Sequence, residues 1–151
     1  MPHYQQLMTI AAPPETVWEI LENPIYTMKL YPDFLAIKVE PEGRTAAGQM
    51  RISKARAGTK LFEIRTVVSE VVPCKRLVLK ESKGGAFTDF KEVIELTREK
   101  SATRLSASFD FTVSQSYFEG MNVAALEGAA RSNMISFLKN LRELAELKPL
   151  R

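Results

Sequence analysis

Residues 105–113, LSASFDFTV, are followed after a short polar break by residues 121–147, MNVAALEGAARSNMISFLKNLRELAEL. In the first stretch apolar residues alternate with polar ones, which is the two-residue period of a half-buried strand. In the second stretch apolar residues recur every three or four positions, as in an amphipathic helix. This change of period predicts a strand that leads into one long C-terminal helix.

The helical pattern begins beyond Ser116 and holds to about Leu147. A helix of roughly 30 residues is about 45 Å long. Its expected buried stripe consists of Met121, Ala125, Ala129, Asn133, Phe137, Leu141 and Leu144, flanked by Leu126, Ala130, Met134 and Leu138. Only a strongly curved sheet could bury so much of such a helix in a chain of this size.

Upstream of the helix, strand patterns follow one another through short turns. The alternating apolar positions are Leu35, Ile37 and Val39; Met50 and Ile52; Phe62, Ile64, Thr66 and Val68; Leu77 and Leu79; Phe90, Ile94 and Leu96; and residues 105–113. A further strand is expected over Tyr4–Ala12, and two short helices are expected over 14–22 and 25–30, which end at Asn23-Pro24 and Tyr31-Pro32. Short turns between consecutive strands predict an antiparallel meander.

The composition narrows the classes of function. The chain has 151 residues, 45% of them hydrophobic and 26% charged, with a net charge of +3, which fits one globular domain. It shows no apolar run long enough to span a membrane, no signal peptide and no basic stripe for nucleic acid. With Cys74 as the one cysteine and His3 as the one histidine, a disulfide, a metal site and a cofactor are not expected, and we expect a cytoplasmic protein.

Five stretches, in this order, carry a resemblance to a known superfamily. They are IAAPPETVW (10–18), YPDFL (31–35), EVVPCKRL (70–77), TRL (103–105) and the final helix. With them the chain resembles the SRPBCC superfamily, the START-like, helix-grip proteins related to the birch-pollen allergen. The stretch YPDFL is similar to the polyketide-cyclase and coenzyme-Q-binding branch.

The resemblance implies an α+β helix-grip fold over residues 1–151, in which a curved seven-stranded antiparallel sheet wraps around the C-terminal helix. It implies a cavity between sheet and helix for an apolar small molecule such as a lipid, an isoprenoid quinone or a polyketide. We expect binding, and possible transport, of such a ligand. Two alternatives stay open: an enzyme of the polyketide cyclase or aromatase type, and an interaction module with a protein partner or a second copy of the chain.

Glu92 is the candidate for chemistry. Strict alternation with Phe90 and Ile94 points it inward, where a carboxylate needs a partner or a raised pKa. Lys54, in phase with Met50 and Ile52, is the expected partner. Glu92 would then orient a ligand or act as a general base, with Tyr26, Tyr31 or Tyr117 as further proton carriers. Alternatively, a bulge returns Glu92 to water.

The first half of the long helix is unusually small-sided, with Ala124, Ala125, Gly128, Ala129 and Ala130. Because protein interiors are closely packed, small side chains leave space for a ligand or allow a close approach of helix and sheet. Both readings stay open. The residues expected to bind the ligand are Phe62, Ile64, Thr66, Phe90, Glu92, Phe109, Phe111, Ala125, Ala129 and Asn133.

Overall fold

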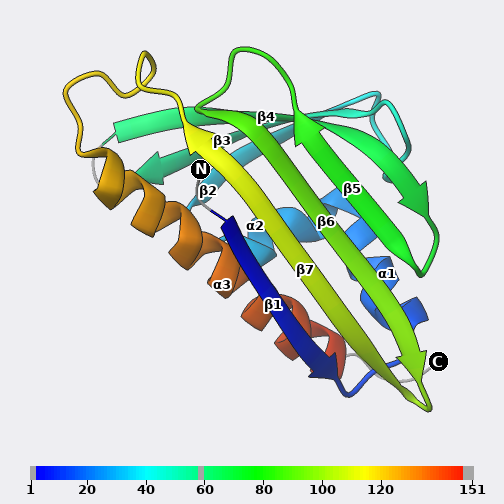
Figure 1. Ribbon diagram of the computed structural model, residues 1–151. Helices are drawn as coiled ribbons and strands as arrows, with labels where there is room; N and C mark the ends of the chain where they lie inside the picture. The colour runs from blue at the N-terminus through cyan, green and yellow to red at the C-terminus, as the bar shows by residue number, and fades with distance from the viewer. Residues whose placement is uncertain (1–2, 58–59, 148–151) are drawn as a thin grey trace.

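A computed structural model describes residues 3–57 and 60–147 (Figure 1). Its strands are β1 (His3–Ile10), β2 (Phe34–Glu40), β3 (Met50–Ala57), β4 (Lys60–Val72), β5 (Arg76–Glu81), β6 (Phe87–Glu99) and β7 (Ala102–Val113). Its helices are α1 (Pro14–Glu22), the 3-10 helix η1 (Pro24–Tyr26), α2 (Thr27–Leu30) and α3 (Val123–Leu147). Within the described ranges, no helix is both long and apolar enough to cross a membrane.

The strands form one antiparallel sheet in the order β1-β7-β6-β5-β4-β3-β2. Figure 1 shows the sheet curving, with α3 running along one face and α1 and α2 on that same face. The long C-terminal helix therefore lies in the grip of a curved seven-stranded sheet. This architecture confirms the predicted α+β helix-grip fold.

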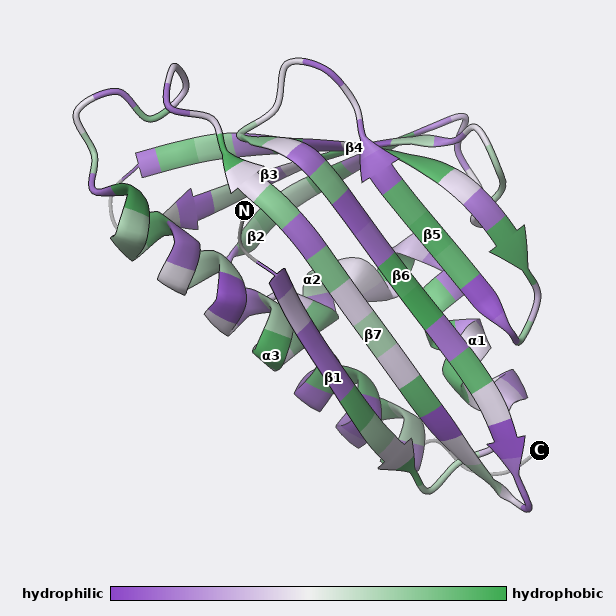
Figure 2. Ribbon diagram, viewed as in Figure 1, coloured by the Kyte–Doolittle hydropathy of each residue, from purple (hydrophilic) through white to green (hydrophobic). Residues whose placement is uncertain are grey.

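The central strands follow the predicted alternation. Figure 2 shows hydrophobic and hydrophilic residues alternating along β6 and β7. The inward side chains of β7 are all buried, namely Leu105, Ala107, Phe109, Phe111 and Val113. On β4 and β6, Phe62, Thr66, Phe90 and Ile94 are buried as well. This shared inner face forms the hydrophobic core against α3.

The face of β3 that points inward is the opposite of the predicted one. Arg51, Ser53 and Ala55 are buried, whereas Lys54 is exposed. In the register with β4, Arg51 lies opposite Thr66, Ser53 opposite Ile64 and Ala55 opposite Phe62. Residues opposite each other in a sheet share a face, so the inner face of β4 sets the phase of β3. The prediction that Lys54 points inward is therefore wrong.

A bulge at the start of β2 explains why Leu35 does not point inward, as its alternation with Ile37 and Val39 predicted. The register with β3 shifts between Phe34 and Ala36, and Leu35 is 43% exposed. An extra residue in one strand changes the face that the following residues occupy. Leu35 therefore does not share the inner face with Val39, which is buried.

Helix α3 begins later than its sequence pattern suggested. Residues 116–120 form turns, and Asn122 Oδ1 accepts a hydrogen bond from the backbone N–H of Ala125 at 3.3 Å. The buried face consists of Leu126, Ala130, Met134, Phe137, Leu138, Leu141 and Ala145. The helix is thus rotated towards the predicted flanking row, because burying leucine and methionine gains more free energy than burying alanine.

Two glycines give a matched test of the packing. A Cβ added at Gly85 would lie 2.8 Å from the backbone nitrogen of Arg65, whereas one added at Gly128 would meet nothing within 4 Å. We expect Gly85→Ala to destabilise the fold by about 1–3 kcal/mol, because the adjoining strand must move. Gly128→Ala, on an exposed helix face, should stabilise it by about 0.5–1 kcal/mol. Urea denaturation measures both, and equal effects would contradict the packing at Gly85.

Candidate functional site

A cavity lies between the inner face of the sheet, the junction of α2 and β2, and the first half of α3. Its volume is about 80 Å³. Eight of the ten predicted ligand residues line it: Phe62, Ile64, Thr66, Phe90, Glu92, Phe109, Ala129 and Asn133. The remaining lining is largely apolar, with Phe34, Leu79, Phe87 and Met134 among it.

Phe111 and Ala125 lie outside this lining. Phe111 is 1% exposed and packs against Phe87, with ring centroids 5.2 Å apart. Ala125 is exposed and lines a separate groove together with Asp33 and with Arg56 of β3. Of the five small residues in the first half of α3, only Ala129, at the mouth, and the buried Ala130 therefore line the cavity.

Glu92 points inward, as its alternation with neighbouring residues predicted, and is 3% exposed. A bulge does occur in β6, but the register with β7 shifts between Thr88 and Lys91, before Glu92 is reached. Leu79 of β5 and Phe109 of β7 lie directly opposite Glu92 on its two sides. The carboxyl group is thereby enclosed by apolar side chains.

Two polar side chains act on Glu92. The hydroxyl of Tyr31 donates a hydrogen bond to Glu92 Oε1 at 3.4 Å, and the positive charge of Arg51 acts across the cavity. Burial raises the pKa of Glu92 to about 7, although Arg51 and Tyr31 both act to lower it. Burial, followed by the charge of Glu92, raises the pKa of Tyr31. Glu92 can therefore gain or lose a proton near neutral pH.

Arg51 replaces Lys54 as the basic residue near Glu92. It is 7% exposed, and burial lowers its pKa while the charge of Glu92 opposes that shift. Among the ion pairs of the described residues, none joins Arg51 to Glu92. The two charged groups thus share the cavity without a direct contact.

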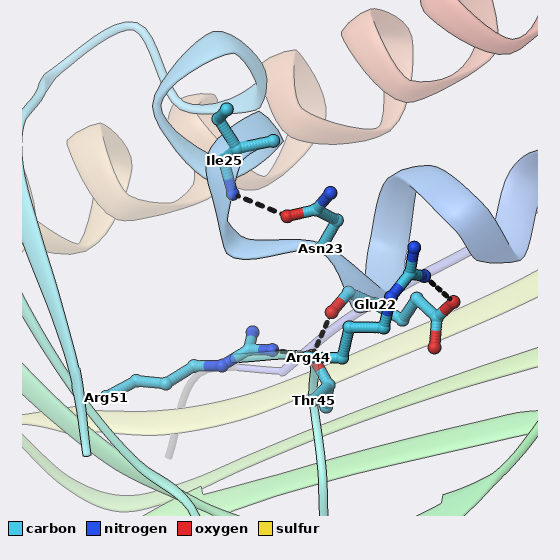
Figure 3. A network of polar contacts seen from close by, with 6 residues as sticks. All are labelled: Glu22, Asn23, Ile25, Arg44, Thr45 and Arg51. Atoms are coloured by element: carbon cyan, nitrogen blue, oxygen red, sulfur yellow. Dashed lines mark hydrogen bonds and ion pairs between the residues drawn. The ribbon is translucent and has the colours of Figure 1, made fainter. Parts of the chain in front are cut away.

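The loop before β3 holds the guanidinium of Arg51 (Figure 3). Thr45 Oγ1 donates its proton to the carbonyl oxygen of Glu22 at 2.7 Å and accepts a hydrogen bond from Arg51 Nη2. Because a hydroxyl has only one proton, this arrangement leaves its lone pairs for Arg51. Arg51 Nε is buried and has no hydrogen-bond partner. One N–H of the guanidinium therefore lacks an acceptor within the described part of the chain.

The three tyrosines proposed as proton carriers lie in different places. Tyr31 contacts Glu92 and stacks between Phe34 and Phe137, with ring centroids 4.4 and 4.7 Å apart. Tyr117 accepts a hydrogen bond from the backbone N–H of Glu63 at 2.8 Å. Neither Tyr117 nor Tyr26 lines the cavity. Of the three, only Tyr31 is placed to exchange a proton with Glu92.

Metal ligation finds no support in the described part of the chain. No group of three or more histidine, cysteine, aspartate or glutamate side chains comes together there. Among the described residues, the titratable groups that line the cavity are the carboxyl group of Glu92, the phenol of Tyr31 and the guanidinium groups of Arg51 and Arg56.

The comparison with protein families agrees with this fold. The sequence model of a family described as "Polyketide cyclase / dehydrase and lipid transport" matches residues 1–146. The chain belongs to this family. None of the curated proteins matches the sequence.

Solved structures share the fold of this member of the polyketide cyclase, dehydrase and lipid transport family. The Zhui aromatase/cyclase from Streptomyces sp. R1128 has a TM-score of 0.78 and 17% identity, covering 96% of this chain and 93% of its own. The protein TTHA0849 from Thermus thermophilus has a TM-score of 0.77 and 19% identity, covering 95% and 97%. A START superfamily protein from Mycobacterium smegmatis has a TM-score of 0.73 and 14% identity, covering 95% and 97%.

The raised pKa of Glu92 makes a prediction about the stability of this family member. Its pKa of about 7 in the folded state exceeds the ordinary value of 4.5. Between these values the folded state binds more protons than the unfolded state, so stability falls as pH rises through the window and levels off above it. Between pH 5 and pH 8 we expect the free energy of unfolding of wild type to fall by about 2–3 kcal/mol more than that of Glu92→Gln.

Urea denaturation of the two proteins across this pH range measures the difference. Using the difference between two proteins removes the contributions of the other titrating groups, which both proteins share. Glu95→Gln on the exposed side of β6 serves as the control and should keep the wild-type slope. Parallel pH profiles of wild type and Glu92→Gln would contradict the raised pKa.

Proposed function

We propose that this protein binds an apolar small molecule, such as a lipid, an isoprenoid quinone or a polyketide, in the cavity between the sheet and α3. The observation that carries the proposal is the buried Arg51, whose Nε has no partner, in a largely apolar lining. A buried donor without an acceptor costs about 1–3 kcal/mol. A ligand oxygen that accepts from Arg51 would recover this free energy.

The combination of apolar and polar side chains in the cavity lining supports this proposal. Aromatic and aliphatic side chains supply apolar area, while Arg51, Glu92 and Tyr31 form one polar cluster. Small-molecule sites commonly combine an apolar wall with a few polar groups that orient the ligand. An apolar molecule with an oxygen function at one end matches this arrangement.

The cavity volume constrains how such a ligand enters. The volume of about 80 Å³ is smaller than the roughly 300–1,000 Å³ of sites for drug-sized ligands. A larger ligand must therefore displace lining side chains or widen the mouth at Thr27, Arg56 and Ala129. Bound and free protein would then differ in the packing of α3.

Solvent extraction of freshly purified protein, followed by mass spectrometry against a buffer blank, tests the proposal. We expect an apolar compound in about one-to-one ratio with wild type. Ala130→Met should reduce it at least ten-fold, because Ala130 lines the cavity and a larger side chain there occupies the ligand space. The matched control, Ala124→Met, lies at an exposed position of the same helix outside the cavity lining and should retain the compound.

Binding of N-phenyl-1-naphthylamine, followed by its fluorescence, gives an independent measurement on the same three proteins. The dye should bind wild type and Ala124→Met more tightly than Ala130→Met. If all three variants bind alike, or if none retains a compound or binds the dye, the proposal is wrong.

A second candidate function is catalysis of the cyclase or dehydrase type, for which the placement of Glu92 gives a specific reason. A carboxyl group with a pKa of about 7 is well suited to remove a proton from carbon at neutral pH. The carboxylate would take the α-proton of a ketone, and the enolate oxygen that forms would accept from Arg51. The Zhui structure is that of an aromatase/cyclase, and its shared fold is consistent with this candidate. No observation favours the third reading, an interaction module.

Exchange of the α-protons of 2-tetralone for deuterium, followed by NMR, tests catalysis. The catalysed rate should rise with pH up to about 7 and then level off, because the ionised form of Glu92 is the base. Glu92→Gln should lower it by about 10²–10⁴-fold. Tyr117→Phe, a tyrosine outside the cavity lining, is the control. Exchange that is unchanged in Glu92→Gln would rule out this role.

A further inference from the structure

Arg51 brings a positive charge into the cavity without a paired anion. It is 7% exposed, its Nη2 donates to a neutral hydroxyl on Thr45, and its Nε has no partner. A guanidinium remains charged at any physiological pH. Buried charges are ordinarily paired, because an uncompensated one is costly. The cavity therefore offers a site for an anionic oxygen beside Arg51.

Few charges compete for this site. In the described part of the chain, the charged side chains that line the cavity are Arg51, Arg56 and Glu92. Arg56 lies at the exposed mouth, where water screens its charge. When Glu92 is protonated, the interior carries the positive charge of Arg51 alone. When Glu92 is ionised, its negative charge repels an anion that enters the cavity.

The surroundings of Glu92 show which groups can change its protonation. Arg51 comes from β3, and Tyr31 comes from the segment after α2. The neighbouring strands β5 and β7 present Leu79 and Phe109, and α3 presents the uncharged Asn133 to the cavity. An anion that occupies the space between Arg51 and Glu92 would therefore be the strongest new influence on that carboxyl group.

We propose that the cavity selects an amphiphile with a carboxylate head group, which pairs with Arg51, and that Glu92 takes up one proton from solvent as the ligand binds. This inference rests on the proposed function, the binding of an apolar molecule, and names its chemical class. The carboxylate accepts from the guanidinium of Arg51, while the protonated Glu92 donates to it rather than repelling it. The hydrocarbon part lies against the apolar lining formed by Phe62, Phe87 and Phe90.

Isothermal titration calorimetry with octanoate and octan-1-ol tests the proposal. The two probes share a chain length and differ in the charge of the head group. At pH 8 Glu92 is mostly ionised, because its pKa is about 7. Titration in phosphate and in Tris, whose ionisation enthalpies differ, gives the number of protons taken up. We expect octanoate to bind wild type at least ten times more tightly than octan-1-ol, with close to one proton taken up.

Two variants assign the effects to residues. Glu92→Gln should bind octanoate at least as tightly as wild type but without proton uptake, which separates protonation of Glu92 from protonation of octanoate itself. Arg51→Met should lose the preference for octanoate over octan-1-ol. If Arg51→Met does not fold, the comparison of the two probes on wild type still decides the role of charge.

The remaining outcomes distinguish failure of this inference from failure of the proposed function. Equal affinity of wild type for octanoate and octan-1-ol would overturn the carboxylate class and leave the apolar cavity standing. Tighter binding of octanoate without proton uptake would overturn the role of Glu92. Binding of neither probe would overturn the proposed function together with this inference.

Discussion

Burying Arg51 on the inner face of the sheet costs several kcal/mol unless its N–H groups find acceptors. The loop between β2 and β3 supplies one such acceptor in Thr45, which is fixed in turn by the carbonyl of Glu22 at the end of α1. The end of a helix, a loop and a strand are thus tied together around one guanidinium. Because Thr45 holds Arg51 without an ion pair to Glu92, both groups stay available at the cavity surface.

The sequence predicted the parts of the fold in which one period persists. In β4, β6 and β7, long alternating runs placed Phe62, Glu92 and Phe109 on the inner face, and the structure agrees. The long helix was equally evident from its period. Its start was not, because the apolar residues of 116–121 continue the helical pattern although they belong to turns; Phe118, for example, is buried within them.

Of the two charged residues at the centre of the site, only Glu92 could be predicted from the sequence. Glu92 could be found because a charged residue stood in an apolar row, whereas Arg51 lies in β3, where Met50 and Ile52 suggested the wrong inner face. A usable signal was present, since Ser53 and Ala55 are small residues in phase with Arg51 and could lie opposite the large inner side chains of β4. The choice between the two faces depends on the register with β4, which a single strand pattern does not contain.

A ligand larger than the cavity must move part of its wall, and the wall differs in how firmly it is held. The second half of α3 buries Phe137, Leu138 and Leu141, and Asn140 Nδ2 donates to the carbonyl of Leu30 at 3.0 Å. The first half buries Leu126, Ala130 and Met134 among mostly exposed small residues. Opening the cavity costs the least free energy where the fewest apolar contacts are lost. The first half of α3 is therefore the segment expected to move. The small residues there thus bear on the cavity by lowering the cost of widening it, although most of them do not line it.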